Sequence, residues 1–192
     1  MIGSGRRVLV LHGWQNRRPE GHWQSWLIER LRSRGEQVLY PQLPRPDEPQ
    51  LDEWRELLAA ELAQLGHGER VVICHSLSCL LWAHAAPHLG RLARVDRLLW
   101  VAPPGPSAFV EAVATFAPRD LDVEAIAATA STRRLVCGDD DPYCPEGAER
   151  VYRPLGFSVT VLAGAGHLDP DAGFGPWPAV ERWALGSLDV FA

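Results

Sequence analysis

Lysine is absent from the sequence, and all 19 basic residues are arginine. A Walker-type phosphate loop needs Gly-Lys followed by Ser or Thr, so the absence of lysine excludes that motif. No Gly-x-Gly-x-x-Gly follows the first predicted strand, which removes the usual dinucleotide-binding signature. The formal net charge is −5 and the arginines are scattered along the chain. We therefore expect neither a nucleotide cofactor nor a nucleic-acid partner.

Cysteine is scarce, and long apolar runs are missing near the N-terminus. The 4 cysteines form no Cys-x-x-Cys pair and no metal-ligand spacing. We expect buried free thiols in a reducing compartment, with no metal and no cofactor. The first residues, MIGSGRRVLVLHGW, hold an apolar run too short for a signal-peptide core or a membrane span. These features predict a cytoplasmic protein with no membrane partner.

The rest of the composition is that of a folded α/β protein. With 192 residues, 46% of them hydrophobic and 22% charged, the chain suits one domain spanning residues 1–192. Apolar runs predict strands at 6–13, 36–41, 70–74, 97–104, 133–138 and 157–164. Helical periodicity predicts helices at 22–35, 51–66, 77–86, 107–116, 145–152 and 178–188. Apolar strands alternating with helices predict an all-parallel sheet covered on both faces.

Chemically useful side chains follow several of these strands. His12-Gly13-Trp14 comes after the first, Ser76 after the third, three aspartates after the fifth and His167 after the sixth. The carboxyl ends of parallel strands meet at one edge of a sheet, where ligands bind. Serine, acid and histidine in this chain order are typical of α/β-hydrolases.

Ser76 lies at a strand-to-helix turn and has two interpretations. A serine there can simply cap the following helix. Alternatively, it is a nucleophile on a sharp elbow, whose usual pattern is Gly-x-Ser-x-Gly. Here Cys74 and Ser78 occupy the glycine positions. Both are small, so the elbow remains sterically feasible, with a slightly wider spacing between helix and strand.

A serine hydroxyl needs a base and an orienting carboxylate to attack an acyl carbon. His167 is the only histidine beyond position 88, and it lies in a glycine-rich loop directly after the last strand. The acid must come from the three consecutive aspartates. We expect Asp141, because Pro142 fixes the chain direction after it, with Asp140 as the alternative.

The oxyanion of the reaction needs two preorganised N–H donors. We expect one from the backbone of Leu77, which follows the nucleophile, and one from Trp14, with Gly13 allowing the close turn. Most tryptophans lie on predicted helices among apolar neighbours and belong to the core. Trp14 and Trp177 are the candidates for the wall of a substrate site.

Four segments together carry a family resemblance: LVLHGW, HSLSC, DDDPYCP and GHLDPDAGFGPWP. On these motifs, from about residue 7 to residue 186, the chain resembles the small serine hydrolases that include retinoblastoma-binding protein 9. The resemblance implies a compact α/β-hydrolase fold with strand order 2-1-3-4-5-6. It also implies a Ser76–Asp141–His167 triad. The family usually has glycine after HSL, where this chain has Ser78.

We therefore expect a serine hydrolase that cleaves a small carboxylic ester or a related acyl compound through an acyl-enzyme. The segment 103–132 has room for only one short helix. No large lid is expected, and the partner is a small-molecule acyl substrate. Two alternatives remain: a weakly active or non-catalytic protein-interaction module on the same scaffold, and a peptidase or thioesterase using the same triad.

Overall fold

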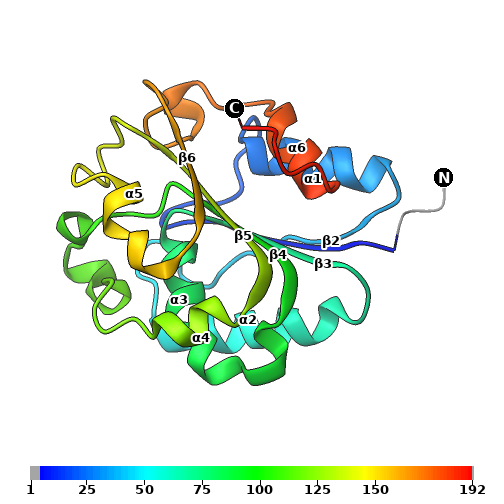
Figure 1. Ribbon diagram of the computed structural model, residues 1–192, viewed down its shortest axis with the longest axis horizontal. Coiled ribbons are helices and arrows are strands. Elements are labelled where there is room, and N and C mark those ends of the chain that lie inside the picture. Colours follow the sequence, from blue (N-terminus) through cyan, green and yellow to red (C-terminus); the bar gives the residue numbers. More distant parts are fainter. Residues whose placement is uncertain (1–4, 192) are drawn as a thin grey trace.

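Six parallel strands form one sheet through the centre of the molecule (Figure 1). The structure is a computed structural model that describes residues 5–191; residues 1–4 and 192 of the predicted domain lie outside this range. The strands run in the order β2-β1-β3-β4-β5-β6, all parallel, as predicted. Their bounds are β1 Arg7–Leu11, β2 Gln37–Leu39, β3 Arg70–His75, β4 Val95–Val101, β5 Ala130–Gly138 and β6 Ser158–Leu162.

Helices cover both faces of the sheet. The α-helices are α1 Trp23–Ser33, α2 Leu51–Leu65, α3 Leu77–Leu89, α4 Val123–Ala127, α5 Ala148–Val151 and α6 Pro178–Ala184. In Figure 1, α1 and α6 lie on one side of the sheet and α2, α3 and α4 on the other. Short 3-10 helices lie at Gly90–Ala93, Pro106–Ala108, Glu111–Phe116, Arg153–Leu155 and Pro170–Ala172. This is the doubly covered parallel sheet that the alternating pattern predicts.

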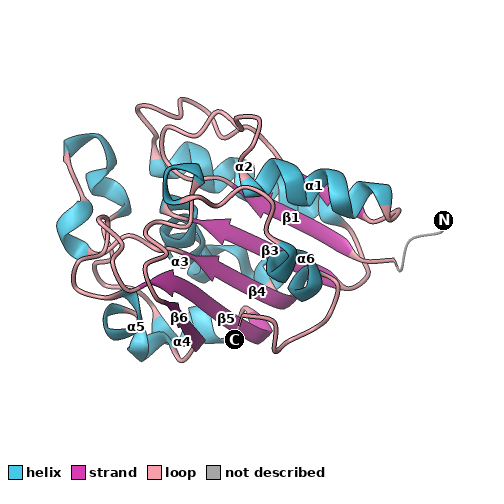
Figure 2. Ribbon diagram, turned by 90° about the horizontal axis from the view of Figure 1, so that it is seen from above, coloured by secondary structure: helices cyan, strands magenta, loops and turns pink. Residues whose placement is uncertain are grey.

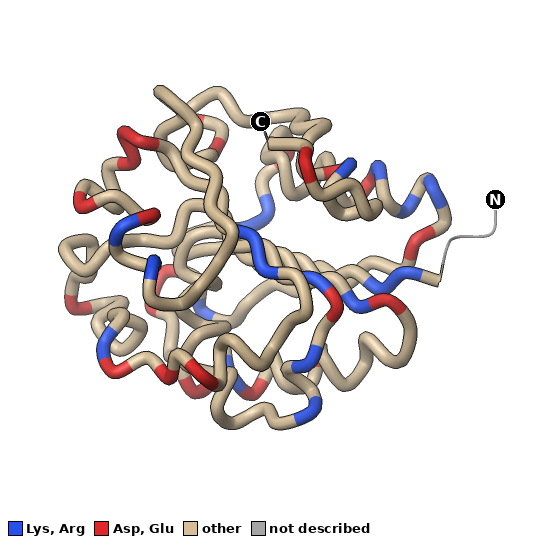
Figure 3. The backbone as a smooth tube through the Cα atoms, in the orientation of Figure 1, with Lys and Arg blue, Asp and Glu red and all other residues tan. Residues whose placement is uncertain are grey.

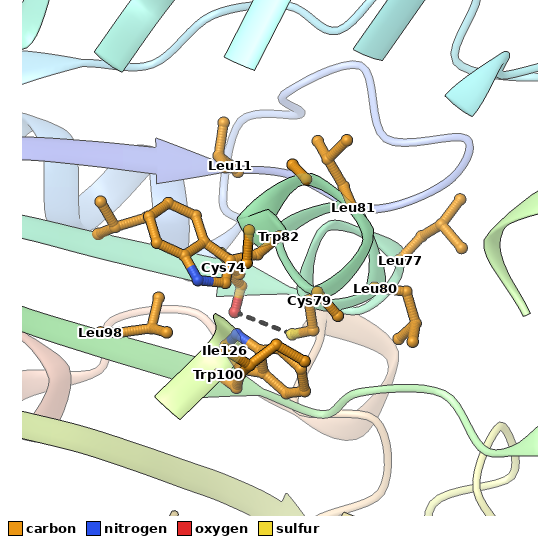
Figure 4. Packing of buried hydrophobic residues seen from close by; sticks show 14 of the residues in the cluster. Leu11, Cys74, Leu77, Cys79, Leu80, Leu81, Trp82, Leu98, Trp100 and Ile126 are labelled. Carbon is orange, nitrogen blue, oxygen red and sulfur yellow. Dashed lines mark hydrogen bonds between the residues drawn. The ribbon is translucent and has the colours of Figure 1, made fainter. Parts of the chain in front are cut away.

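The hydrophobic core has two parts because the central strands are buried on both faces. Under α2 and α3, the fully buried Trp54 and Trp82 pack with alternate residues of β1, β3 and β4. Figure 4 shows how tightly α3 lies on β3 here: the Cys79 thiol donates to the carbonyl of Cys74 at 3.5 Å. Small residues at these two positions let the helix approach the strand. Under α1 and α6, the buried Trp23 and Trp183 belong to the second part of the core.

The connection after β4 differs from the predicted helix at 107–116. Two 3-10 turns occupy this stretch, with extended backbone at Phe109 and Val110 between them, and α4 follows as an element that was not predicted. Helices this short are marginal without tertiary packing, and aromatic and β-branched residues weaken them further. Packing against neighbouring segments therefore decides the local conformation.

The strands point their carboxyl ends the same way, so the loops that follow them gather at one edge (Figure 2). Charged residues are spread over several elements, and arginines alternate with acidic residues along much of the chain (Figure 3). Among residues 5–191, no helix is both long and apolar enough to cross a membrane.

Candidate active site

Ser76 has a strained backbone at the junction of β3 and α3. Its φ is 56° and its ψ is −125°, a region that residues other than glycine rarely adopt. Such a conformation costs about 1–3 kcal/mol and persists only where the surroundings impose it. The Ser76 N–H donates to the carbonyl of Val101 on β4 at 2.9 Å, which anchors the turn. The Ser76 side chain makes no capping bond to α3, so it does not serve as an ordinary helix cap.

The Ser76 hydroxyl instead meets the imidazole of His167. The distance from Ser76 Oγ to His167 Nε2 is 2.9 Å. The other ring nitrogen, Nδ1, lies 2.9 Å and 3.0 Å from the two carboxylate oxygens of Asp141. His167 is 8% exposed and Asp141 is 3% exposed. An Nδ1–H that donates to Asp141 leaves Nε2 as an acceptor for the serine proton, which is the arrangement of a general base.

The three consecutive aspartates bind three different partners. Asp139 accepts the N–H of Gly164 at 2.8 Å, and Asp140 accepts the N–H of Gly166 at 2.7 Å. Only Asp141 contacts His167. The first two carboxylates therefore fix the backbone of the loop that carries the histidine, while the third orients its ring.

A close approach between two loops brings His167 to this position. A Cβ atom at Gly138, the last residue of β5, would overlap the carbonyl oxygen of Gly166. Glycine at 138 therefore lets the loop after β6 fold down against β5. The positive φ of Gly166 (50°) and of Leu168 (52°) turns this loop sharply on both sides of the histidine.

The loop after β1 also packs directly against Ser76. A Cβ atom built on Gly13 would lie 2.7 Å from the Cβ of Ser76, so only glycine permits this contact. His12 lies 2.8 Å from the carbonyl of Gly13 through its Nδ1, and its Nε2 accepts the N–H of Leu43 at 2.8 Å. Its Nδ1 therefore carries the proton and donates to Gly13. Because C=O and N–H point in opposite directions across a trans peptide, the N–H of Trp14 is directed away from His12.

Two backbone donors beside Ser76 are free. Within the described part of the chain, neither the N–H of Trp14 nor that of Leu77 has a hydrogen-bond acceptor. Leu77 is the first residue of α3, where N–H groups have no partner inside the helix and the helix dipole favours negative charge. Both residues line the cavity described below.

Ser78, at the unusual elbow position, forms hydrogen bonds between three segments. Its Oγ accepts the N–H of His75 at 2.9 Å, and it lies within donating distance of the carbonyls of Leu11 (3.0 Å) and His75 (2.9 Å). It is fully buried. The hydroxyl therefore links the start of α3 to the ends of β1 and β3, a contact that glycine would not make.

His75 and Trp23 support the histidine loop from behind. The Nε2–H of His75 donates to the carbonyl of His167 at 3.1 Å, and the indole N–H of Trp23 donates to the carbonyl of Leu168 at 2.8 Å. Burial lowers the pKa of His75 well below its usual value, so this ring stays neutral. His75 is thus part of the structure that supports the loop of His167.

Trp177 does not line the cavity, which corrects the prediction that it belongs to the substrate wall. It is 8% exposed and lies edge-on to Trp23 at 5.5 Å and to Phe174 at 5.0 Å. The chain segment before α6 turns its indole into the core on the α1 side of the sheet. Trp177 therefore packs against Trp23, whose indole N–H holds the loop of His167.

A cavity of about 520 Å³ opens above Ser76, between the loops that follow β1, β3, β4, β5 and β6. Trp14 is among its lining residues, with its indole N–H donating to the carbonyl of Asp47 at 2.9 Å. Six lining residues have apolar side chains, and we call them the apolar wall: Trp14, Leu77, Pro104, Ala108, Phe109 and Val113. The polar wall is the set of polar and charged lining residues that includes Asn16, Arg17, Glu20, His22, Asp169 and Asp171.

Several lining residues were not predicted from the sequence. Tyr143 places its ring 4.5 Å from that of His167, and Phe109 and Val113 reach the cavity from the irregular segment after β4. His22 lines the cavity from the N-terminus of α1. The pattern Asp-Pro-Tyr gives a weak signal for Tyr143, because it lies two residues after the predicted acid. Among the described residues, no three His, Cys, Asp or Glu side chains are grouped to hold a metal ion.

Similar proteins share this architecture over nearly the whole chain. YdeN of Bacillus subtilis is 24% identical over 182 residues, which cover 91% of this chain and 92% of YdeN. The crystal structure of the ydeN gene product matches with a TM-score of 0.81 at 22% identity, covering 95% of this chain and 97% of that one.

More distant structures show how widely the fold is used. A structure reported under LipS and LipT, two metagenome-derived lipolytic enzymes, matches with a TM-score of 0.70 at 16% identity, covering 96% of this chain and 93% of that one. The thioesterase domain from the curacin biosynthetic pathway matches with a TM-score of 0.64 at 14% identity, covering 96% and 93%. At these identities the likeness concerns the fold alone, and the fold supports several acyl chemistries.

The family model described as serine hydrolase matches residues 8–184. With this match and the α/β-hydrolase architecture, the chain belongs to the serine hydrolase family and is a hydrolase.

Proposed function

We propose that this hydrolase cleaves small carboxylic esters, with Ser76 as nucleophile, His167 as general base and acid, and Asp141 as the orienting carboxylate. The observation that carries the proposal is the continuous hydrogen-bonded row from Ser76 Oγ through His167 to Asp141, with a gap of 2.9 Å at the serine. This row opens into a cavity that has an apolar wall.

The first half of the reaction forms an acyl-enzyme. Ser76 Oγ attacks the carbonyl carbon of the ester while its proton passes to His167 Nε2. The negative charge that develops on the carbonyl oxygen is held by the N–H groups of Trp14 and Leu77. As the tetrahedral intermediate collapses, the carbon–oxygen bond to the alcohol breaks and His167 gives its proton to the leaving oxygen.

The second half returns the enzyme to its starting state. Water, deprotonated by His167, attacks the acyl carbon, and the bond to Ser76 Oγ breaks as the hydroxyl regains its proton. The products are a carboxylic acid and an alcohol. Every proton is accounted for by the serine, the histidine and water, so this reaction requires no cofactor.

A cavity of about 520 Å³ suits a small acyl compound. The wall formed by Trp14, Phe109 and Val113 offers an apolar surface to the acyl chain. We therefore propose short aliphatic esters as substrates, with thioesters and amides as the other bonds that the same residues could attack.

The test is labelling with a fluorophosphonate probe, followed by mass-spectrometric mapping, on the wild type and on Ser76→Ala. A single adduct on Ser76 that disappears in the variant is the expected result. A panel of aryl esters, acyl thioesters and aminoacyl amides then ranks the three bonds, with the esters expected to react fastest. A folded protein that takes up no adduct and cleaves none of these compounds would overturn the proposal in favour of an interaction module.

A further inference from the structure

His22 lines the cavity but has no role in the proposed reaction or in holding the loop of His167. It lies at the N-terminal cap of α1, and its Nδ1 accepts the N–H of Gln24 at 3.1 Å. The residue is 3% exposed, yet it lines the cavity. Its ring lies 5.5 Å from that of His75, which in turn lies 5.1 Å from the ring of His167.

The capping bond fixes which ring nitrogen carries the proton. Burial lowers the pKa of His22 from 6.5 to about 4, so the ring is neutral near pH 7. A neutral imidazole has a single N–H, and because Nδ1 accepts a hydrogen bond, the proton is on Nε2. His22 is therefore a donor of fixed tautomer at neutral pH.

This Nε2–H has no acceptor among the described residues. The Nε2 atom itself is not fully buried, so it is in contact with the solvent space of the cavity. A nearly buried ring thus directs an unpaired donor into the cavity. A hydrogen-bond donor that has lost most of its contact with water is stabilised when a substrate oxygen accepts a hydrogen bond from it.

The polar wall restricts what kind of oxygen this is. The lining includes three acidic residues, Glu20, Asp169 and Asp171, but one arginine, Arg17, which forms an exposed pair with Asp47. This excess of acidic residues disfavours an anionic group in the cavity. The carboxylates of these acidic residues can only accept hydrogen bonds, so they cannot donate to a substrate oxygen. The Nε2–H of His22 can donate, and it is suited to an uncharged oxygen.

The position beside His167 indicates which part of the substrate is involved. Asp169 follows His167 by two residues, and Asp169 and His167 both affect the pKa of His22 electrostatically. Because His167 delivers its proton to the leaving oxygen, the alcohol part of the ester is expected on the side of the cavity where His22 and Asp169 lie near His167. The apolar lining residues are then available to the acyl chain.

We infer that His22 is a specificity residue whose Nε2–H binds an uncharged oxygen, ether or hydroxyl, in the alcohol part of the ester. The inference rests on the proposed ester hydrolysis and narrows its substrates to esters of short oxygen-bearing alcohols. His22 is expected to act on substrate binding and to leave the proton transfers to the triad.

Two pairs of esters isolate this contact. In each pair one CH₂ group is replaced by an ether oxygen: n-butyl against 2-methoxyethyl butyrate, and n-pentyl against 3-methoxypropyl butyrate. An ether oxygen only accepts, so the carboxylates of the polar wall cannot bind it. The quantity measured is the ratio of kcat/KM for the ether ester to that for its alkyl partner.

Two variants separate the donor from the other roles of His22. His22→Ser keeps a good helix cap but removes the ring, and His22→Phe keeps a ring but removes the cap. Both lose the Nε2–H. The matched control is His67→Ser, an exposed histidine outside the lining of the cavity.

We expect the ether-to-alkyl ratio to fall about three- to tenfold in both His22 variants for at least one ester pair, the effect of one lost hydrogen bond. In His67→Ser the ratio should equal that of the wild type. An unchanged ratio in both His22 variants would overturn the inference. A fall in only one of them would also overturn it, because that variant's loss of the cap or of the ring would then be the cause.

A binding measurement keeps this test independent of catalysis. Calorimetry on Ser76→Ala, with and without His22→Phe, gives the same ratio as dissociation constants for each ester pair. If the wild type cleaves no ester and takes up no fluorophosphonate, the proposed function fails. The ratio of dissociation constants would still decide whether His22 binds the ether oxygen.

Discussion

Replacing Ser78 by glycine would restore the usual elbow residue, but the structure predicts that it damages the protein. The hydroxyl of Ser78 accepts a hydrogen bond from the buried N–H of His75. Its second partner, the carbonyl of Leu11, also accepts from the side-chain amide of Gln24 at 2.9 Å and would stay satisfied. The variant therefore removes one buried hydrogen bond of the His75 N–H and leaves that group only its position in the β1–β3 ladder, where Leu11 pairs with Cys74.

The magnitude follows from that one hydrogen bond. One buried hydrogen bond contributes about 0.5–1.5 kcal/mol, which is the expected loss in the free energy of unfolding for Ser78→Ala. Ser78→Gly should lose about 1 kcal/mol more, because glycine near the start of α3 is less favourable than alanine. For a chain of this size, 1 kcal/mol corresponds to roughly 2–4 °C in Tm.

The measurement is urea unfolding followed by circular dichroism and tryptophan fluorescence, with linear extrapolation to water. The matched control is Ser33→Ala, because Ser33 is an exposed serine of α1 whose hydroxyl bonds only to the carbonyl of Arg30. It should change stability by less than about 0.5 kcal/mol.

Two results would refute this reasoning. One is a Ser78→Ala protein as stable as Ser33→Ala. The other is a Ser78→Gly protein that is at least as stable as the wild type and reacts faster with fluorophosphonate. The second result would mean that Ser78 merely obstructs an elbow that works better with glycine.

Three further predictions concern the acid, the buried histidines and the cysteines. Asp141→Asn should slow fluorophosphonate labelling about 10³- to 10⁴-fold, because the amide no longer holds the Nδ1–H tautomer of His167. Asp140→Asn keeps an oxygen that accepts the N–H of Gly166, so it should slow labelling by less than tenfold. Equal labelling rates in the two variants would contradict their separate roles. Burial lowers the pKa of His12 and of His22 from 6.5 to about 4, so each is neutral when folded and protonated when unfolded between these values. The free energy of unfolding should therefore decrease as the pH falls from 6.5 to 4, by about 1.4 kcal/mol per pH unit for each histidine, and urea unfolding of His12→Gln should show a smaller slope; an identical slope would show that His12 is not the titrating group. Burial raises the pKa of Cys137 and of Cys144 to about 12, and it also raises the pKa of Cys74. Iodoacetamide at pH 8 should therefore modify these cysteines only after unfolding. Rapid alkylation of the native protein, detected by mass spectrometry, would contradict this.

The sheet was predictable because its signal is local and strong. Runs such as RVLVL and RVVICH are buried on both faces, and the glycines and polar residues that follow them mark the strand ends. Parallel strands put those ends at one edge, so chain order alone brought Ser76, Asp141 and His167 to one place in the prediction. The choice of Asp141 over Asp140 rested on Pro142, and the structure gives each aspartate a different contact.

The parts that were missed depend on packing between distant segments. Trp177 and His22 look alike in the sequence, as aromatic residues at helix starts, but one turns into the core and the other toward the cavity. The direction of each side chain depends on how the loops before α6 and α1 cross the edge of the sheet. The spacing of apolar residues in the sequence does not predict that path. The segment after β4 presents the same difficulty. The apolar residues Phe109 and Val113 could belong either to a core-facing helix or to the lining of the cavity, and the sequence does not distinguish these.

The histidines around the site explain why only one of them is suited to be the base. His12, His22 and His75 are buried, and each has a lowered pKa and a ring nitrogen engaged by the backbone. They remain neutral donors or acceptors of fixed tautomer, so they position the chain without competing for the serine proton. When His167 takes that proton, it becomes a cation, and a charged neighbour 5.1 Å away would oppose this step. Neutral rings on that side and the carboxylate of Asp141 on the other let the positive charge form where the proposed reaction needs it.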